Sequence, residues 1–356
     1  MNELSDQATQ PRRGEELPPA ALQAFLHETL PEVGDILEIS QFPGGASNLT
    51  YLLRTTRGQF VLRRPPHGTK AASAHDMGRE YRVLTRLRDV FPYCPEPLVF
   101  CDDRSVLGEP FYLMERLEGI VLRRDLPAGL SLSPGQAEAL CRNLVDVHLE
   151  LHGIDFRAAG LQDLGRPEGY VTRQVEGWST RYRAARTDDV PDNEALMNWL
   201  ASHLPPEAGR AAIIHNDFKF DNVVLRPSDL AIIGVLDWEM ATLGDPLMDL
   251  GCSLAYWIEA DDPAPLQQMR MMPTHLPGMM TRRQILEHYL AAGGNELNDF
   301  CFYRVFGLFR LAVIAQQIYF RYTRGQTRDP RFAGFGRLCA LLSARAEAVT
   351  GGNSPL

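Results

Sequence analysis

Two segments of the chain decide the fold, and they read His215-Asn216-Asp217-Phe218-Lys219-Phe220-Asp221-Asn222-Val223-Val224 and Val235-Leu236-Asp237-Trp238-Glu239. The first contains the pattern H-x-D-x-x-x-x-N and runs into a short apolar strand, predicted over residues 222–225. A turn at residues 226–229 leads to a second apolar strand, predicted over residues 231–236, which ends at an aspartate. Because two such strands form a hairpin, we expect Asn222 and Asp237 to lie at the same end of it.

This constellation matches what phosphoryl transfer from ATP requires. The reaction needs a carboxylate that orients the attacking hydroxyl and accepts its proton, and it needs oxygen ligands for Mg²⁺. Asp217 fits the role of catalytic base, and Asn222 and Asp237 fit the role of metal ligands. Each of these alone could be a turn residue, and His215 could be a satisfied core histidine. The complete pattern, with an aspartate after the second strand, favours catalysis.

Composition excludes several other classes of protein. The 356 residues and 45% hydrophobic content are enough for two lobes, and the net charge of -9 argues against a nucleic-acid partner. The six cysteines have no C-x-x-C spacing, which indicates reduced thiols in a cytoplasmic protein. Residues 1–19 are polar and predict a flexible tail without a signal sequence. The apolar helix predicted over residues 300–322 contains Arg304 and Arg310, so we expect a core helix rather than a membrane span.

The order of predicted elements indicates an α+β protein with two lobes. Strands are predicted over residues 36–39, 49–54, 59–64, 98–102 and 111–115, with helices over residues 20–30 and 73–90. After Gly119 the chain becomes mostly helical, with helices predicted over residues 134–153, 169–186, 193–204, 246–259, 281–292, 298–322 and 334–349. We therefore expect a small β-sheet lobe that binds the nucleotide over residues 20–117. A helical lobe with the catalytic loop and acceptor site would follow over residues 118–356.

A glycine turn lies between two strands of the first lobe. Glycines let the backbone approach phosphate oxygens, so Gly44 and Gly45 are candidate phosphate-binding residues, and Ser47 and Asn48 could add donors. In isolation the same residues could form an ordinary turn. Their position ahead of the Asp217 loop favours the phosphate-binding role.

The strand at residues 60–64 and the helix after it predict a second part of the nucleotide site. Alternation places Val61 and Arg63 on one face of the strand, and a cation there could pair with Glu80 and hold the α- and β-phosphates. The alternative is a solvated surface pair. The apolar strand at residues 111–114 then runs into a linker, where Glu115 and Leu117 would hold adenine through their backbone groups.

Further residues are predicted to support the catalytic loop or the acceptor. Asp245 precedes a proline and suits a helix N-cap, whereas Asp249 lies one turn into an apolar helix and needs partners. We expect both to brace the loop, together with His215. On the helix at residues 300–322, Arg310 shares a face with Gln317 and Arg321. This stripe could bind an anionic acceptor, or the helix could be an ordinary amphipathic one whose arginines meet solvent or structural carboxylates.

These motifs, in this order, resemble the aminoglycoside phosphotransferase family of protein-kinase-like enzymes over about residues 35–325. Segments that are similar to one branch of it, the kinase-like domain fused to some acyl-CoA dehydrogenases, are residues 60–66, 111–115, 236–246 and 309–312. The resemblance implies a kinase-like fold with a five-stranded amino-terminal lobe, and it implies ATP and Mg²⁺. Arg63 stands where kinases place a lysine; the branch often has arginine there, so the departure does not exclude activity.

The predicted function is therefore phosphorylation of a hydroxyl group on a small molecule. The branch implies a hydroxylated acyl chain, a hydroxy acid or its CoA thioester as the acceptor. One alternative is an antibiotic-modifying kinase, whose acidic pocket could come from Glu259, Asp261 and Asp262. Another is a pseudokinase that binds nucleotide without turnover, which only the arginine at position 63 favours.

Overall fold

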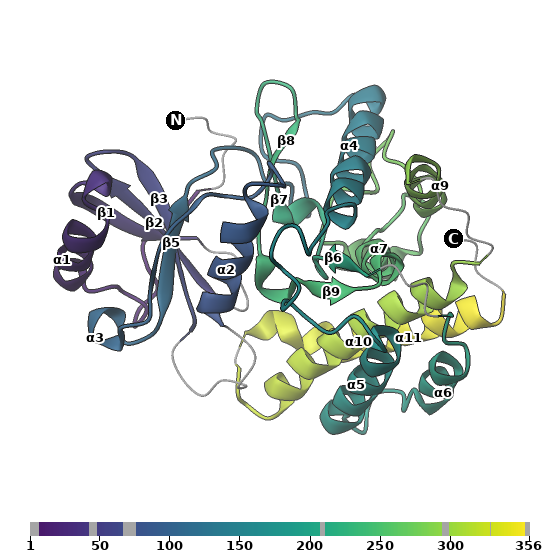
Figure 1. Ribbon diagram of the computed structural model, residues 1–356. Coiled ribbons are helices and arrows are strands. Elements are labelled where there is room, and N and C mark those ends of the chain that lie inside the picture. Colours follow the sequence, from purple (N-terminus) through teal and green to yellow (C-terminus); the bar gives the residue numbers. More distant parts are fainter. Residues whose placement is uncertain are drawn as a thin grey trace. The chain divides into compact units, whose positions relative to one another are not determined.

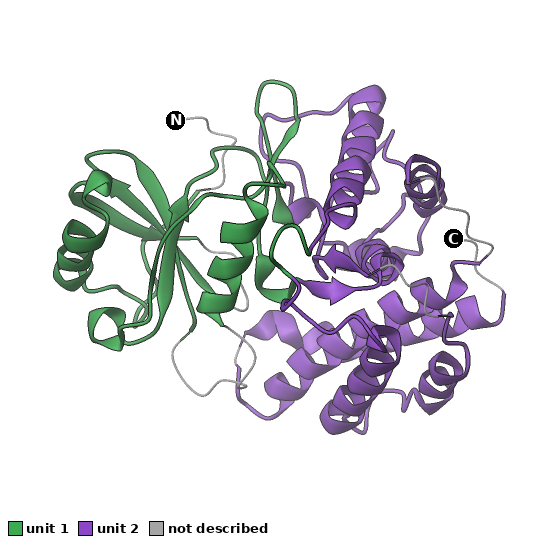
Figure 2. Cartoon of the chain, in the orientation of Figure 1, with its two compact units in different colours: residues 1–121, 157–161, 222–241 green, residues 122–156, 162–221, 242–356 purple. Residues whose placement is uncertain are grey.

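The computed structural model describes residues 7–42, 48–66, 76–206, 211–293, 299–327 and 329–352, and the chain divides into two compact units (Figures 1 and 2). Unit 1 comprises residues 1–121, 157–161 and 222–241, and unit 2 comprises residues 122–156, 162–221 and 242–356. The hairpin that carries Asp237 therefore belongs to unit 1, although it follows residue 118 in the sequence.

Unit 1 is built on a five-stranded antiparallel sheet with the order β1-β2-β3-β5-β4. Its strands are β1 (Ile36–Gln41), β2 (Leu49–Thr55), β3 (Gln59–Arg64), β4 (Pro97–Cys101) and β5 (Phe111–Glu115). Its helices are α1 (Pro19–Thr29), α2 (Met77–Leu87) and α3 (Arg104–Leu107), with 3₁₀ turns η1 (Pro31–Val33) and η3 (Trp238–Met240). A separate hairpin pairs β7 (Val223–Leu225) with β8 (Ile232–Val235).

The two faces of this sheet have different partners. In Figure 1, α1 and α3 lie on one side of the sheet and α2 lies on the other. Leu62 of β3 belongs to the apolar core that contains Leu22 and Leu26 of α1. Since side chains alternate along a strand, the neighbouring Arg63 points to the opposite face, toward α2. One apolar face thus stabilises the sheet, and the other presents charged groups.

Part of the segment expected to be a loose tail is attached to the sheet. Thr9 pairs with Gln41 at the end of β1, and the hydroxyl of Tyr51 donates to the carbonyl of Glu15 over 2.6 Å. Leu17 adds an anchor because its side chain is buried in the core beneath α1. Residues 7–18 therefore cover an edge of the sheet.

Unit 2 is mostly helical. Its helices are α4 (Pro134–His152), α5 (Tyr170–Ala185), α6 (Glu194–Ser202), α7 (Pro246–Ala255), α8 (Ala264–Met269), α9 (Arg282–Ala292), α10 (Cys301–Thr323) and α11 (Phe335–Thr350), with the 3₁₀ turn η4 (Pro330–Gly334). A two-stranded antiparallel ribbon, β6 (Ala212–Ile214) with β9 (Thr242–Gly244), flanks the catalytic segment. The 3₁₀ turn η2 (Phe220–Asn222) ends this segment and leads into β7. The short elements α3, α8, β6 and β9 were not predicted.

The long helix α10 organises the core of unit 2. By length and composition it could cross a membrane, but 72% of its most apolar stretch is buried inside the protein, where it packs against α5, α7 and α11. Its crossing with α7 is unusually close. A Cβ at Gly251 would lie 2.3 Å from the Tyr303 carbonyl oxygen, and a Cβ at Gly307 would lie 2.1 Å from the Gly251 carbonyl oxygen. Only glycine permits this approach of the two backbones.

We predict that Gly251→Ala lowers the free energy of unfolding by about 1–3 kcal/mol, because the added methyl group meets backbone rather than a movable side chain. Urea unfolding monitored by circular dichroism measures this change. Gly177→Ala on α5 is the matched control, since its Cβ would meet only the Arg181 guanidinium at 3.5 Å. A Gly251→Ala protein as stable as the control would contradict the close crossing.

Candidate functional site

The β7–β8 hairpin of unit 1 brings the two candidate metal ligands to one end. Val223 pairs with Val235, and the Asn222 carbonyl accepts the Leu236 N–H over 2.8 Å, so Asp237 begins the next turn beside Asn222. Asp237 has a left-handed backbone conformation, with φ 69° and ψ 58°. A non-glycine residue in this region is held there by its surroundings and is common at functional sites.

Arg63 on β3 lies at the centre of a carboxylate cluster in unit 1. Its Nη2 is 2.8 Å from Asp237 Oδ1, 3.2 Å from Glu80 Oε1 on α2, and 4.0 Å from Glu239 Oε2. Burial lowers the pKa of Arg63, but Glu80 and the other acidic neighbours more than offset this and raise the pKa well above its ordinary value. The guanidinium therefore remains charged.

The donor set of this cluster suits a hard divalent cation. Arg63 faces three carboxylates, so negative charge exceeds positive charge among these four side chains. Glu80 is almost fully buried, yet its Oε2 has no hydrogen-bond partner within the described residues. Carboxylate and amide oxygens are the ligands that Mg²⁺ prefers, and Asp237 and Asn222 offer them at the hairpin end.

Glu239 and Arg79 are part of this region and were not predicted. The amide of Asn48 donates to Glu239 Oε2 over 2.6 Å, which ties the end of the glycine segment to the turn after Asp237. Arg79 on α2 donates to the carbonyls of Glu239 and Ala241, so it holds the backbone of the same turn. A second carboxylate two residues after Asp237 was a visible signal. The other phosphate-binding candidates, Gly44, Gly45 and Ser47, lie outside the described residues.

The linker after β5 contributes backbone and an apolar side chain to unit 1. The N–H of Glu115 donates to the Glu96 carbonyl over 2.8 Å, and its carboxylate accepts the Glu96 N–H over 2.7 Å. Leu117 packs against β8, where a Cβ at Gly234 would lie 2.1 Å from Leu117 Cδ1. Gly234 therefore makes room for the linker next to the hairpin.

In unit 2, Asp217 forms a close ion pair with Lys219 of the same loop. Lys219 Nζ is 2.7 Å from Asp217 Oδ2 and 3.1 Å from Asp221 Oδ1, and the lysine side chain is buried. Burial raises the pKa of Asp217, but Lys219 and, after it, Arg310 bring the pKa below its ordinary value. About 22% of the Asp217 side chain is exposed, so an ionised carboxylate is accessible to a ligand.

The backbone before Asp217 is held by Asp249 on α7. Asp249 Oδ2 accepts the His215 N–H and Oδ1 accepts the Asn216 N–H, each over 2.7 Å. Asn216 has a left-handed backbone with φ 65°. Asp245 caps α7 by accepting the N–H groups of the two residues after Pro246. Two histidines of α4, at positions 148 and 152, also contact Asp249 and were not predicted, although their spacing of one helical turn was visible.

Arg310 is buried in α10 and lies near Asp217, Tyr256 and Cys252. Its guanidinium stands 5.1 Å from the centre of the Trp178 ring. Burial by itself lowers the pKa of Arg310, but the surrounding groups, with Cys252 first, raise it above its ordinary value. Among the residues that the structure describes, Arg310 forms no ion pair with a carboxylate.

This architecture, an antiparallel sheet of five strands joined to a helical unit, is shared with kinase-like enzymes. A protein from Ralstonia eutropha, described as a candidate aminoglycoside phosphotransferase, superposes with a TM-score of 0.80 at 28% identity and covers 96% of this chain and 100% of its own. Choline kinase from Cryptosporidium parvum shares the fold alone, with a TM-score of 0.63 at 12% identity, 95% of this chain and 98% of that one being covered.

The chain belongs to the phosphotransferase enzyme family, whose sequence profile matches residues 38–279. Within it, the chain is similar to acyl-CoA dehydrogenase family member 10 of Mus musculus, with 36% identity over 330 residues, which are 90% of this chain and 30% of that protein. The resemblance to this branch is thus confirmed. The chain spans less than half the length of the acyl-CoA dehydrogenase relatives that it matches.

Proposed function

We propose that this protein is an ATP- and Mg²⁺-dependent kinase that phosphorylates a hydroxyl group of a small anionic molecule. Membership of the phosphotransferase family supports the reaction class. The observation that carries the proposal is the state of Asp217, an accessible carboxylate that Lys219 keeps ionised on a loop with a fixed backbone. Such a group is suited to accept a proton from an alcohol as the alcohol attacks.

In the proposed step, the acceptor oxygen forms a bond to the γ-phosphorus while the bond from that phosphorus to the bridging oxygen of ADP breaks. The hydroxyl proton passes to Asp217 Oδ1 or Oδ2, and the electron pair of the broken bond leaves with ADP. Lys219 already neutralises Asp217, so the carboxylate is a weak base that orients the hydroxyl and takes the proton late.

Within unit 1, Asn222 and Asp237 would hold Mg²⁺, and Arg63 would contact the α- and β-phosphates. When bound, the metal ion neutralises charge that develops on the phosphate oxygens. Glu80 orients Arg63, and Glu239 adds a second carboxylate to the metal-binding end of the hairpin. Asn48 donates to Glu239, so its side chain is tied to this end of the hairpin.

The charges of unit 2 favour an anionic acceptor over a polycation. Of the three residues predicted for an acidic pocket, Asp261 is exposed, whereas Glu259 and Asp262 are bound by Arg282 at 3.1 Å and 2.6 Å. Arg345 binds Asp262 as well, at 2.8 Å. Arg310, by contrast, is a buried cation that forms no ion pair with a carboxylate of the described residues, although Asp217 lies near it, and a carboxylate or phosphate of the acceptor would supply one.

A hydroxy acid or a hydroxyacyl-CoA meets this requirement, because it carries both a hydroxyl and an anionic group. The similarity to the acyl-CoA dehydrogenase branch supports the same acceptor class. The six cysteines are all free thiols, five of them buried, in keeping with the reducing cytoplasm proposed as the site of action.

We predict that Asp217→Asn and Asp237→Ala differ in their effect on Mg·ATP binding. The first should reduce kcat by roughly 10²–10⁴-fold and spare Mg·ATP binding, because Asp217 acts on the acceptor hydroxyl. The second should weaken Mg·ATP binding as well, because a metal ligand is lost. A coupled assay of ATP consumption with hydroxyacyl-CoAs, hydroxy acids, aminoglycosides, choline-like alcohols and sugars identifies the acceptor, and calorimetry with Mg·ATP measures binding. Turnover of Asp217→Asn within tenfold of wild type would refute the assignment of Asp217 as the catalytic base.

For the nucleotide, we expect Arg63→Ala to weaken ATP binding by about tenfold or more, and Arg63→Lys to retain much of it, because both cations can face the phosphates. Arg64→Ala is the matched control, since Arg64 is equally buried on the same strand but near Tyr51 on the opposite face. Both alanine variants should melt at lower temperature. If only Arg64→Ala impaired ATP binding, Arg63 would have no part in the nucleotide site.

For the acceptor, Arg310→Gln should raise the acceptor KM by roughly tenfold or more and leave the ATP KM unchanged, because it removes only the proposed anion contact. Arg321 was predicted in the same stripe but is exposed, unlike the buried Arg310, so Arg321→Gln serves as control and should change neither constant. Steady-state kinetics with the acceptor found in the screen provides the comparison. A polycationic acceptor, or normal acceptor kinetics of Arg310→Gln, would overturn this part of the proposal.

A further inference from the structure

A buried cluster behind the catalytic loop joins α4 to α7. His148 and His152 lie one turn apart on α4, and their Nε2 atoms are 3.0 Å and 3.2 Å from the same oxygen, Oδ2 of Asp249. The three side chains are 3%, 5% and 0% exposed, so water does not solvate the carboxylate. A carboxylate removed from water in this way must be compensated by hydrogen bonds or by a cation.

The groups that compensate the buried negative charge of Asp249 are all N–H donors. Two come from the imidazoles, and two come from the backbone of His215 and Asn216 at 2.7 Å each. Burial raises the pKa of Asp249, but the hydrogen bonds from the two α4 imidazoles outweigh it and hold the pKa well below the ordinary range. The backbone that Asp249 grips takes the left-handed turn at Asn216, immediately before Asp217.

Each histidine is itself fixed by a second contact. His152 Nδ1 lies 2.7 Å from the Tyr289 hydroxyl, so both ring nitrogens of His152 are engaged. His148 stacks on Phe218 with ring centres 4.1 Å apart and planes at 13°. Burial, and then repulsion from His152, lower the pKa of His148 to about 4, so its ring is neutral at physiological pH.

The same three residues have a spacing that could hold a metal ion. Hydrogen bonding accounts for the geometry better, because Asp249 Oδ2 also accepts the His215 N–H and a bound metal would compete with it. The contacts of the cluster therefore indicate a role in holding the loop before Asp217.

We propose that His148 and His152 are positioning residues for phosphoryl transfer: as N–H donors they fix the Asp249 carboxylate, which sets the backbone turn that presents Asp217. This inference rests on the proposed function of Asp217. Neither histidine touches a substrate, so loss of its N–H should disturb turnover rather than nucleotide binding. His148 acts on both flanks of Asp217, since it contacts Asp249 on one side and Phe218 on the other.

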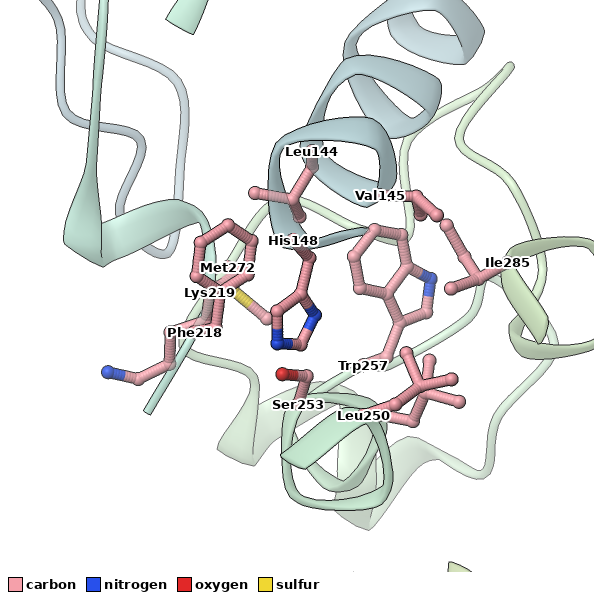
Figure 3. A pocket seen from close by; sticks show the side chains of 11 residues that line it. Leu144, Val145, His148, Phe218, Lys219, Leu250, Ser253, Trp257, Met272 and Ile285 are labelled. Carbon is pink, nitrogen blue, oxygen red and sulfur yellow. The ribbon is translucent and has the colours of Figure 1, made fainter. Parts of the chain in front are cut away.

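Space around His148 permits a conservative test. A cavity of about 20 Å³, enough for about one water molecule, adjoins the ring (Figure 3). It is lined by Leu144, Val145, His148, Phe218, Lys219, Leu250, Ser253, Leu254, Trp257, Met272 and Ile285. Ser253 Oγ has no hydrogen-bond partner within the described residues. A flexible amide in place of the imidazole can therefore be accommodated without overpacking.

The experiment compares asparagine with glutamine at each position. The glutamine amide nitrogen reaches about as far as Nε2 of histidine and can replace its N–H, whereas the shorter asparagine amide cannot. Val147→Ala on α4 is the control for lost stability, because Val147 is equally buried and has no hydrogen bond to Asp249. The readouts are hydrogen exchange of the amides at residues 212–221 and steady-state hydrolysis of Mg·ATP with water as the acceptor.

We expect His148→Asn and His152→Asn to lose kcat by on the order of ten- to a hundredfold, with the ATP KM within about twofold of wild type, because a small displacement of the base is costly. The glutamine variants should regain most of this loss. Exchange at residues 212–221 should accelerate in the asparagine variants and not in Val147→Ala. If an asparagine variant does not fold, Tyr289→Phe, which removes one hydroxyl, should lower kcat in the same manner.

Equal kcat values for the asparagine and glutamine variants would overturn the inference, as would a loss of kcat in Val147→Ala of the same size. If the wild-type protein hydrolyses no Mg·ATP and phosphorylates no acceptor, the proposed function fails. In that case hydrogen exchange still tests whether the two histidines hold the loop. Unchanged exchange at residues 212–221 in both asparagine variants and in Tyr289→Phe would refute the inference.

Discussion

A carboxylate that is taken out of water must be compensated, and the candidate site depends on how each of its carboxylates meets this constraint. Asp249 is compensated by N–H donors, which use both of its oxygens and leave it nothing with which to bind a ligand. Asp217 is compensated by one lysine on its own loop and keeps an exposed edge. Asp237 shares Arg63 with two further carboxylates, so it retains capacity for a cation. Thus one chemical group serves as scaffold, proposed base and proposed metal ligand because its partners differ.

The arginine at position 63 is explained by the same constraint. Its Nη2 meets both Glu80 and Asp237, whereas its Nε has no hydrogen-bond partner within the described residues. A guanidinium remains charged when buried, and its planar fork presents several donors from one position. A charged fork of this kind can hold several carboxylates at once. The substitution for lysine therefore does not by itself argue for a pseudokinase.

Much of the fold was predictable because its signals are local. The alternation of β3 separates Leu62 from Arg63, and the hairpin that follows the catalytic loop brings Asn222 and Asp237 to one end. Elements of three to six residues, such as β6 and α8, were missed because they are too short for a periodic pattern. The attachment of residues 7–18 was missed because it rests on a few contacts to the sheet rather than on a pattern of its own.

Long-range partners were the least predictable part of the site. Asn48 and Glu239 are 191 residues apart in the sequence, and His148 and Asp249 are 101 residues apart. The spacing of the two α4 histidines could be seen, but nothing in a single sequence identifies the carboxylate that they share. A buried polar residue in a helix predicts only that a partner exists. The identity of that partner is a property of the folded chain.

The identity of the acceptor is hard to predict for a similar reason, because the acceptor is a ligand and not part of the chain. The relatives and solved structures establish the family and the fold, whereas acceptors differ among the enzymes that share it. What remains informative is the charge that the protein leaves unpaired. Glu259 and Asp262 are paired with arginines, whereas the buried Arg310 forms no ion pair with a carboxylate of the described residues, although Asp217 lies near it. A buried cation without an ion pair is unfavourable until an anion reaches it, and this is the physical reason for proposing an acceptor that brings a carboxylate or phosphate together with its hydroxyl.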